Sequence, residues 1–397
     1  MAKIRSFEFN LRELAGATGD FGTLFPLAIG YIAVCGLNPA GFLIMMGLAN
    51  VVTGLAYRLP MPIEPMKVLA VVAISQAWSP SMVSASALGA GIIWLLLAMT
   101  GVMGWIAKIT PHSVVRGIQI ALGLLLAITA VRMVSTGWLL GLVSVVVVLL
   151  FRQSRYAPAA LVLMVLGIGM MAVQGNLVQI DPPAFALPVW EVPPLQEVWQ
   201  VLLLAGFAQL PLTATNAIIS TSSLISTYWP ARKIKERQLA WSTGAMNLGA
   251  SLFGGMPMCH GAGGLAGQYH FGARTGGANL MEGTLEIILG LFFASSIVAL
   301  FGGFPQAIIG AMMLMVSIEL MKFARDVRRG RDLVPMAVTV AVSVASNMAL
   351  GFLLGVISHY VMQFILRRRH RDGSTAETSA DDPTRLMTGS PPEEESS

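Results

Sequence analysis

Two short stretches of this sequence place charged side chains beside residues that interrupt a helix. The first, residues 58–67, has three prolines within six residues, and no continuous helix tolerates them because proline lacks an N–H and clashes with the preceding turn. We expect extended chain there, followed by a half-helix over residues 66–75 with Pro65 in its first turn. The unpaired N–H groups of that turn would point into the interior, and Lys67 would add a full positive charge.

The second stretch, residues 254–264, interrupts its helix with glycines. Without a β-carbon, glycine lets backbone N–H groups approach a ligand closely, and His260 adds a side-chain donor. Two facing half-helix N-termini supply partial positive charge and free donors, an arrangement that binds anions. The pattern predicts an anion site. The alternative is that these residues only kink packed helices and that Lys67 pairs with Glu64.

Polar residues in the segments that begin each half of the chain complete the predicted site. They could line the anion site, or they could form hydrogen bonds between helices. The full set of predicted substrate-binding residues is Thr23, Glu64, Pro65, Met66, Lys67, Gln209, Thr213, His260, Gly261, Ala262, Gly263 and Gly264.

Glu64 is an unusual neighbour for an anion, because an ionised carboxylate would repel it. One interpretation is a structural ion pair with Lys67 at helical spacing. The other is that Glu64, together with His260, takes up a proton when the anion binds and so couples the two movements. Other charged residues lie within or beside apolar segments, and we expect them to be helix-packing or gating partners: Asp20, Glu282, Glu286 and Glu319.

Nothing in these stretches predicts an enzyme. Cys259 and His260 are a nucleophile and a base by type, but adjacent side chains diverge and no third group is evident. Cys35 and Cys259 lie far apart in the sequence, so neither a disulfide framework nor a zinc cluster is indicated. We expect no catalytic residue, no cofactor and no metal.

The elements that hold these stretches must cross a membrane. Of the 397 residues, 55% are hydrophobic and 11% are charged, and the mean hydropathy is +0.72, whereas about a quarter of a soluble chain is charged. Apolar runs of about 17 to 25 residues, each long enough to cross a bilayer, recur from Phe21 to Leu366. We expect spans at residues 21–36, 40–57, 62–78, 84–107, 112–133, 137–151, 157–174, 200–225, 237–254, 257–272, 279–302, 305–323, 333–348 and 350–366.

Charge placement orients these spans and excludes nucleic acid as the reason for the basic pI of about 9.4. If the spans alternate in direction, the basic clusters before the first span and after later spans fall on one side, which the positive-inside rule makes cytoplasmic. Both termini would then be cytoplasmic, in a plasma or inner membrane. The N-terminus lacks the features of a cleavable signal.

Weak matches between the two halves, in the same order along the chain, predict an internal repeat. Phe25-Pro26-Leu27 corresponds to Leu210-Pro211-Leu212, and Gly47 to Asn50 corresponds to Gly244 to Asn247. Seven spans in each half is an odd number, so the second repeat is inverted, as in secondary transporters. We expect a cytoplasmic N-terminus (1–20), repeat 1 (21–174), an extracytoplasmic loop (175–199), repeat 2 (200–366) and a disordered cytoplasmic tail (367–397).

These motifs resemble the molybdate transporter family of plants, algae and bacteria, a distant branch of the SulP sulfate-permease group. The matching stretches are GDFGTLFPL (19–27), PMPIEPMK (60–67) and PMCHGAGGLAGQYHFGARTG (257–276). The resemblance implies an all-α polytopic fold of about 14 transmembrane segments as 7+7 inverted repeats, with core and gate domains like those of SulP and nucleobase transporters and no STAS domain. The chain departs from plant and algal members at Glu64, where they have Gln.

The resemblance also implies molybdate, a tetrahedral dianion, as substrate, with sulfate or tungstate as competitors. We therefore expect a secondary active transporter that imports the anion by symport with protons and alternating access. Alternatives are a sulfate permease or a nucleobase carrier of the same fold, an uncoupled anion channel, or a structural membrane protein. The expected partners are the anion, protons and membrane lipid, but no nucleic acid; a homodimer is one assembly to consider.

Overall fold

The computed structural model describes residues 7–151, 159–175, 181–322, 327 and 330–380, and most of them are helical. In the first half the elements are α1 (Leu11–Ala17), η1 (Thr18–Asp20), α2 (Phe21–Ala33), α3 (Pro39–Tyr57), β1 (Ile63–Pro65), α4 (Lys67–Gln76), α5 (Pro80–Thr100), α6 (Met103–Ile109), α7 (His112–Val134), η2 (Ser135–Gly137), α8 (Trp138–Phe151) and α9 (Ala159–Val173).

The second half begins with one long helix that contains two π-helical segments. Its elements are α10 (Leu195–Val201), η4 (Leu202–Gly206), α11 (Phe207–Leu212), η5 (Thr213–Ile219), α12 (Ser220–Tyr228), α13 (Glu236–Leu252), β2 (Met258–His260), α14 (Ala262–Phe271), α15 (Gly277–Phe292), α16 (Ala294–Gly302), α17 (Gln306–Lys322), α18 (Gly330–Ala345) and α19 (Met348–Ala380).

By length and composition, five helical stretches in the described ranges could each cross a membrane. They are Pro39–Tyr57, Pro80–Thr100, His112–Phe151, Leu195–Tyr228 and Met348–Leu366. A sixth candidate is the pair α15 and α16, which is bent by 82°. The half-helix α4 is among the shorter apolar helices.

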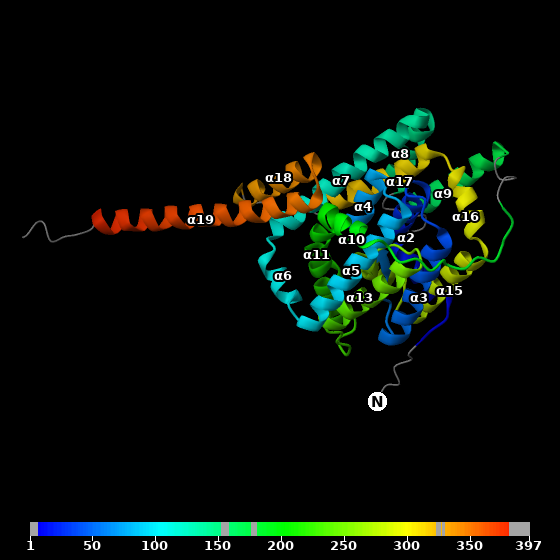
Figure 1. Cartoon of the computed structure of the whole chain (residues 1–397), viewed down its shortest axis with the longest axis horizontal. Coiled ribbons are helices and arrows are strands. Elements are labelled where there is room, and N and C mark those ends of the chain that lie inside the picture. Colours follow the sequence, from blue (N-terminus) through cyan, green and yellow to red (C-terminus); the bar gives the residue numbers. More distant parts are fainter. Residues whose placement is uncertain (1–6, 152–158, 176–180, 323–326, 328–329, 381–397) are drawn as a thin grey trace, which may run out of the picture.

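The helices pack in pairs that join the two halves of the chain. α3 packs on α15, α5 packs on α13, and α7 packs on α17; Figure 1 shows α3 beside α15. In an inverted repeat, α3 is equivalent to α13, α5 to α15 and α7 to α17. The pair of α3 and α15 is then equivalent to the pair of α13 and α5, and the pair of α7 and α17 is equivalent to itself. The observed pairing is therefore the one that the repeat requires.

Close glycine contacts allow this pairing. A β-carbon on Gly47 of α3 would lie 2.5 Å from the Gly283 carbonyl of α15, and one on Gly244 of α13 would lie 2.8 Å from the Leu95 nitrogen of α5. Gly47 and Gly244 are equivalent in the repeat, so both halves use a glycine to bring backbones together, as is common between membrane helices.

The two interrupted stretches pair with each other at the centre of the fold. β1 and β2 form a two-stranded antiparallel sheet with Ile63 opposite His260, Glu64 opposite Cys259 and Pro65 opposite Met258. The half-helices α4 and α14 follow directly. The expectation that Pro65 begins the helix is wrong: Pro65 lies in the strand and α4 starts at Lys67, because pairing with β2 keeps the chain extended for longer than proline spacing alone indicates.

Three other expectations about segment limits are corrected. The expected span at 84–107 is two helices, α5 and α6, separated at Gly101, whose φ of 71° ends α5. The span at 279–302 is the bent pair α15 and α16. In the tail, 367–380 was expected to be disordered but continues α19 away from the body (Figure 1), because extending an existing helix is far easier than nucleating one. Residues 381–397 lie outside the described ranges.

Candidate functional site

The strand pair places both interrupted stretches around one small buried cavity of about 20 Å³. This volume is enough for about one water molecule, so the cavity is too small for a tetrahedral anion in this conformation and must widen to admit one. The cavity is lined by Glu64, Pro65, Lys67, Gln209, Leu212, Thr213, Asn216, Ala217, Cys259, His260 and Gly261.

Lys67 and Glu64 form an ion pair at the cavity. The Lys67 ammonium donates to Oε2 of Glu64 across 3.1 Å. The Glu64 side chain is 3% exposed and that of Lys67 is 20% exposed. Lys67 occupies the first turn of α4, where its charge adds to the positive end of the helix dipole.

The Glu64 carboxylate also lies against the glycines that begin α14. A β-carbon on Gly261 would be 2.4 Å from its Cδ, and one on Gly264 would be 2.2 Å from its Oε1. A β-carbon on Gly263, which lies between them in the sequence, would have no neighbouring atom within 4 Å. The glycine-rich stretch therefore leaves room for an acidic group at the N-terminus of a half-helix, and the protein's own carboxylate lies there.

Gln209 is the second internal group that occupies donors expected to be free. Its Oε1 accepts hydrogen bonds from the backbone N–H groups of Val68 and Leu69, at 2.8 and 3.4 Å. Its Nε2 donates to Thr213 across 2.7 Å. The first turn of α4 is thus already capped by an oxygen, so two of its N–H groups are not free for a ligand in this conformation.

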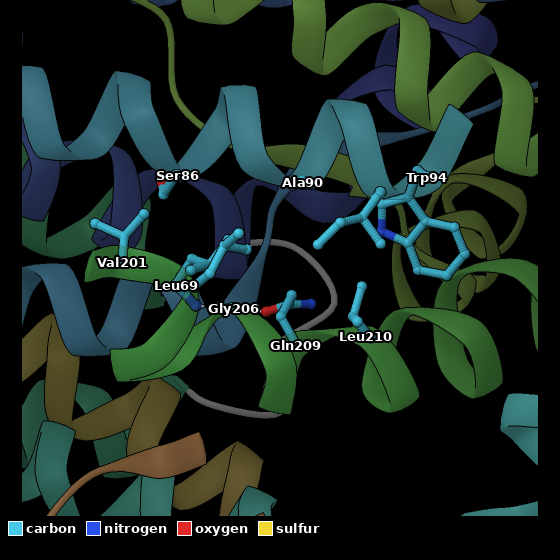
Figure 2. A pocket seen from close by; sticks show the side chains of 10 residues that line it. Leu69, Ser86, Ala90, Trp94, Val201, Gly206, Gln209 and Leu210 are labelled. Carbon is cyan, nitrogen blue, oxygen red and sulfur yellow. Dashed lines mark hydrogen bonds between the residues drawn. The ribbon is translucent and has the colours of Figure 1, made fainter. Parts of the chain in front are cut away.

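Apolar packing fixes the position of Gln209. Figure 2 shows Gln209 and Leu210 on one helix, below α5 with Ser86, Ala90 and Trp94. The space between these helices is a second small cavity, of about 10 Å³. Because that side is nearly filled, the amide of Gln209 has room to change its hydrogen bonds only toward the anion cavity.

His260 lines the cavity, but its Nε2 is 2.7 Å from the hydroxyl of Ser242. Tyr57 donates to the same hydroxyl across 2.8 Å, and its ring meets the imidazole edge to face. These contacts orient His260 toward α13. Cys259 is a buried free thiol, and no group in the described chain makes a nucleophile and base pair of these neighbours.

Five of the predicted residues do not line this cavity. They are Thr23, Met66, Ala262, Gly263 and Gly264. Met66 is fully buried in the core, and its backbone N–H donates to the Pro257 carbonyl across 2.9 Å. Gly264 contributes through its contact with Glu64. The cavity brings together the other seven predicted residues, from three segments far apart in the sequence.

Two buried asparagines hold the interrupted stretches in place, and neither was among the predicted site residues. Asn247 of α13 binds both backbone groups of Met258, at 2.9 Å to the nitrogen and 2.6 Å to the oxygen. Asn279 of α15 does the same for Met61, at 2.7 and 2.6 Å. Asn247 is the last residue of one of the repeat motifs. A polar amide repeated within an apolar motif is the sequence feature that could have identified it as important.

Three further carboxyl groups are buried around the site. Asp20 has no hydrogen-bond partner for either oxygen within the described chain. Glu282 accepts from Gln268 across 3.2 Å, and Glu286 accepts from Asn50 across 2.9 Å. None of these three forms an ion pair with a described residue. Glu319 differs, because it pairs with Lys322 at the end of α17.

The sequence is similar to known transporters of an oxyanion, which agrees with the geometry of this site. A family model described as "Molybdate transporter of MFS superfamily" matches residues 12–126 and 201–320. The chain is 31% identical over 380 residues to molybdate transporter 1 of Arabidopsis thaliana, covering 83% of each. It is 27% identical over 448 residues to molybdate transporter 1 of Chlamydomonas reinhardtii, covering 80% of this chain and 85% of that protein.

Solved structures confirm the predicted fold. The transmembrane domain of the cyanobacterial bicarbonate transporter BicA matches with a TM-score of 0.64 at 16% identity, over 88% of this chain and 96% of that one. The murine anion transporter Slc26a9 in its inward-facing state matches with a TM-score of 0.70 at 14% identity, over 92% of this chain and 69% of that one.

The predicted all-α fold of 7+7 inverted repeats is therefore confirmed, as is the prediction that the protein is not an enzyme. The family model covers more than half of the chain, and the Arabidopsis relative matches over most of its own length. This multi-pass membrane protein belongs to the molybdate transporter family.

Proposed function

We propose that this protein imports molybdate, with Lys67 as the charged anchor of the anion. The observation that carries the proposal is the convergence of both interrupted stretches on one cavity that holds Lys67. The names of the relatives supply the anion, and the two half-helix N-termini supply a site chemistry suited to a tetrahedral oxyanion.

In this proposal, the empty site is closed by internal substitutes for the anion. The Glu64 carboxylate pairs with Lys67, and the Gln209 carbonyl oxygen caps α4. An arriving anion takes over contacts from both. Binding therefore requires Glu64 and Gln209 to shift, which links substrate entry to rearrangement of the cavity.

The proposed alternating access uses two groups of helices. We assign α2 to α5 and α10 to α15 to a core that carries the site, and α7 to α9 and α16 to α19 to a gate. The half-helix α4 contacts both α2 in the core and α7 in the gate. Movement of the core past the gate would expose the cavity to one side and then to the other.

Proton coupling is the role we propose for Glu64. Once an anion pairs with Lys67, an ionised Glu64 would lie beside it without a cation, which is costly in a buried site. Taking up a proton removes that repulsion. Asp20 and Glu282 lie close enough to interact with Glu64, so they are candidates to pass the proton on; His260, held by Ser242, is a weaker candidate.

Positive-inside placement supports an inner or plasma membrane location with both termini cytoplasmic. In that orientation α2 runs outward and α4 runs from the cavity to the outer face. The half-helix α14 runs from the cavity to the cytoplasmic face. Import then carries the anion from the end of α4 to the end of α14.

Uptake of radiolabelled molybdate into proteoliposomes tests this function. We expect uptake that an inward proton gradient accelerates and that Lys67→Ala abolishes, whereas Lys322→Ala, which removes a lysine at the end of α17, leaves it intact. Glu64→Gln should take up molybdate without responding to the pH gradient. If Glu64→Gln keeps the full pH response, the coupling role is wrong.

Competition distinguishes the remaining alternatives. Sulfate uptake without molybdate uptake would make the protein a sulfate permease. Uptake that follows the electrochemical gradient of the anion alone, at any pH difference, would make it an uncoupled anion channel. Uptake of molybdate inhibited by tungstate more than by sulfate would support the molybdate proposal.

A further inference from the structure

A second polar cavity, of about 230 Å³, lies at the far end of α4 from the anion cavity. Ser75 and Gln76 of α4, Thr129 and Arg132 of α7, and Ser343 of α18 contribute to its lining. With Met348 of α19, the walls come from one core helix and three gate helices. Lys67 and Ser75 are eight residues apart on α4, which corresponds to about 12 Å along the helix axis.

Arg132 is exceptional in the charge pattern of the whole chain. Every other lysine and arginine lies in a segment that alternation of the spans places on the cytoplasmic side, or, for Lys67, at the cavity. Arg132 precedes the turn between α7 and α8, on the outer side. A basic residue there opposes the positive-inside rule, so its position calls for a specific reason.

One reason could be structural, because a cation in the last turn of a helix interacts favourably with the helix dipole. Arg132 lies in the last turn of α7. Its guanidinium, however, is exposed and has no hydrogen bond or ion pair to any other residue in the described ranges. By contrast, Arg274, at the cytoplasmic end of α14, donates to two backbone carbonyls and lies over the Tyr269 ring.

Ser343 also contributes to the lining, but its hydroxyl oxygen packs against Gly351 of α19, where a β-carbon would lie 1.9 Å from it. Ser343 is 2% exposed, and its hydroxyl has no hydrogen-bond partner in the described part of the chain. The other polar lining residues are hydroxyl and amide side chains, which can donate hydrogen bonds: Ser75, Gln76, Thr129, Ser346 and Asn347. A cation without a partner among such donors suits an oxyanion.

We propose that this outer cavity is an entry site that captures the oxyanion at Arg132 before it passes along α4 to Lys67. The inference rests on the proposed import function for its direction of movement. Loose binding suits this role, because the guanidinium is in contact with water and its attraction is screened by salt. The site raises the local concentration of anions at the outer end of α4 and repels cations.

A thiol reporter measures this concentration without requiring transport. Ser346 lines the cavity and is exposed, whereas both natural cysteines are buried. The experiment uses Ser346→Cys protein in right-side-out vesicles. We expect the anionic reagent sulfonatoethyl methanethiosulfonate to label the introduced thiol faster than its cationic trimethylammonium analogue does. A unit charge about 6 Å away in water changes the local concentration of a monovalent ion by about threefold. Loss of the Arg132 charge lowers the concentration of the anionic reagent and raises that of the cationic reagent. Arg132→Gln should therefore lower the ratio of the anionic to the cationic labelling rate by about tenfold.

Two further measurements separate capture from a structural role. Molybdate in the outer solution should slow the labelling of Ser346→Cys protein, and this protection should disappear with Arg132→Gln. In uptake assays, Arg132→Gln should raise the KM about tenfold at low ionic strength with Vmax unchanged, and Arg132→Lys should restore most of the loss. The difference should shrink in high salt.

The outcomes distinguish this proposal from the import function. An unchanged rate ratio in Arg132→Gln, or a lower melting temperature with an unchanged ratio, overturns the entry site even if the protein transports molybdate. An Arg132-dependent ratio with molybdate protection supports the entry site even if proteoliposomes take up no molybdate. That second result would reject the proposed function alone.

Discussion

Replacing Gly264 by alanine should displace the Glu64 carboxylate, whereas the same change at Gly263 should not. Both glycines lie in the first turn of α14. A β-carbon at Gly264 would lie 2.2 Å from Oε1 of Glu64 and 3.0 Å from Cβ of Pro62, but one at Gly263 meets nothing within 4 Å. The two variants thus add the same atom to the same turn and differ only in what it meets.

The magnitude follows from these distances. Ordinary contact begins near 3.4 Å, so the Glu64 oxygen must move by about 1.2 Å, or α14 must shift by a similar amount. Overpacking of this kind costs about 1 to 3 kcal/mol. At Gly263 the added methyl reduces the conformational freedom of the unfolded chain, and a gain of up to about 1 kcal/mol is expected. We therefore expect the stabilities to differ by about 1 to 4 kcal/mol.

Thermal unfolding in detergent and uptake in proteoliposomes together form the assay. Gly264→Ala should unfold at a lower temperature than the natural protein and should lose the pH response of uptake, because the moved carboxylate no longer pairs with Lys67 at 3.1 Å. Gly263→Ala should unfold at the same temperature as the natural protein or slightly above it, and it should keep the pH response of uptake. Equal stability and equal uptake in the two variants would refute the assigned contact between Gly264 and Glu64.

Two other perturbations test single contacts. Gln209→Ala removes the acceptor for Val68 and Leu69 and should lower the unfolding temperature, because about 1 to 3 kcal/mol of stability is lost. Added molybdate should stabilise this variant more than the natural protein. Equal stabilisation would contradict the idea that Gln209 and the anion bind the same N–H groups. Burial raises the pKa of the Glu13 carboxyl, in helix α1 before the first predicted span, above its ordinary value of 4.5. A carboxyl group with a raised pKa in the folded state contributes stability at low pH, and this contribution is lost as the pH rises through that pKa. Glutamine does not titrate, so the unfolding temperature of Glu13→Gln minus that of the natural protein should increase from about pH 5 to pH 8. A difference that stays constant over this range would argue against a raised pKa for Glu13.

Local patterns in the sequence were sufficient for the interruptions, and they offered the ion pair as one of two interpretations of Glu64. Proline spacing predicted extended chain before Lys67, and a separation of three residues placed Glu64 within reach of its ammonium. The repeat also predicted that the two stretches face each other, which the register of β1 and β2 confirms. These features depend on short-range rules, and on symmetry that both halves carry in their residues.

Contacts between distant segments were beyond the sequence. Gln209 is 141 residues from the N–H group of Val68 that it caps, and Asn279 is 218 residues from Met61. Nothing in either local pattern specifies such a partner, because a buried amide can satisfy many backbone groups. The strand at Pro65 was missed for the same reason: its extended conformation is stabilised by β2, which lies far along the chain.

The two repeats contribute different chemistry to one symmetric site. The first half supplies Lys67 and Glu64, whose charges cancel in the closed cavity. The second half supplies glycines, and these leave space for a carboxylate at the N-terminus of α14. An incoming dianion would leave this cavity with a net charge of −2 if Glu64 stayed ionised, and each negative charge carried inward opposes a membrane potential of 100 mV by about 2.3 kcal/mol. In the proposed coupling, protonation of Glu64 would remove half of that cost, and a second proton, on a group such as Asp20 or Glu282, would remove the rest. The proposed coupling thus makes the buried carboxyl groups around the site as relevant to accumulation as the proposed anchor Lys67 is to binding.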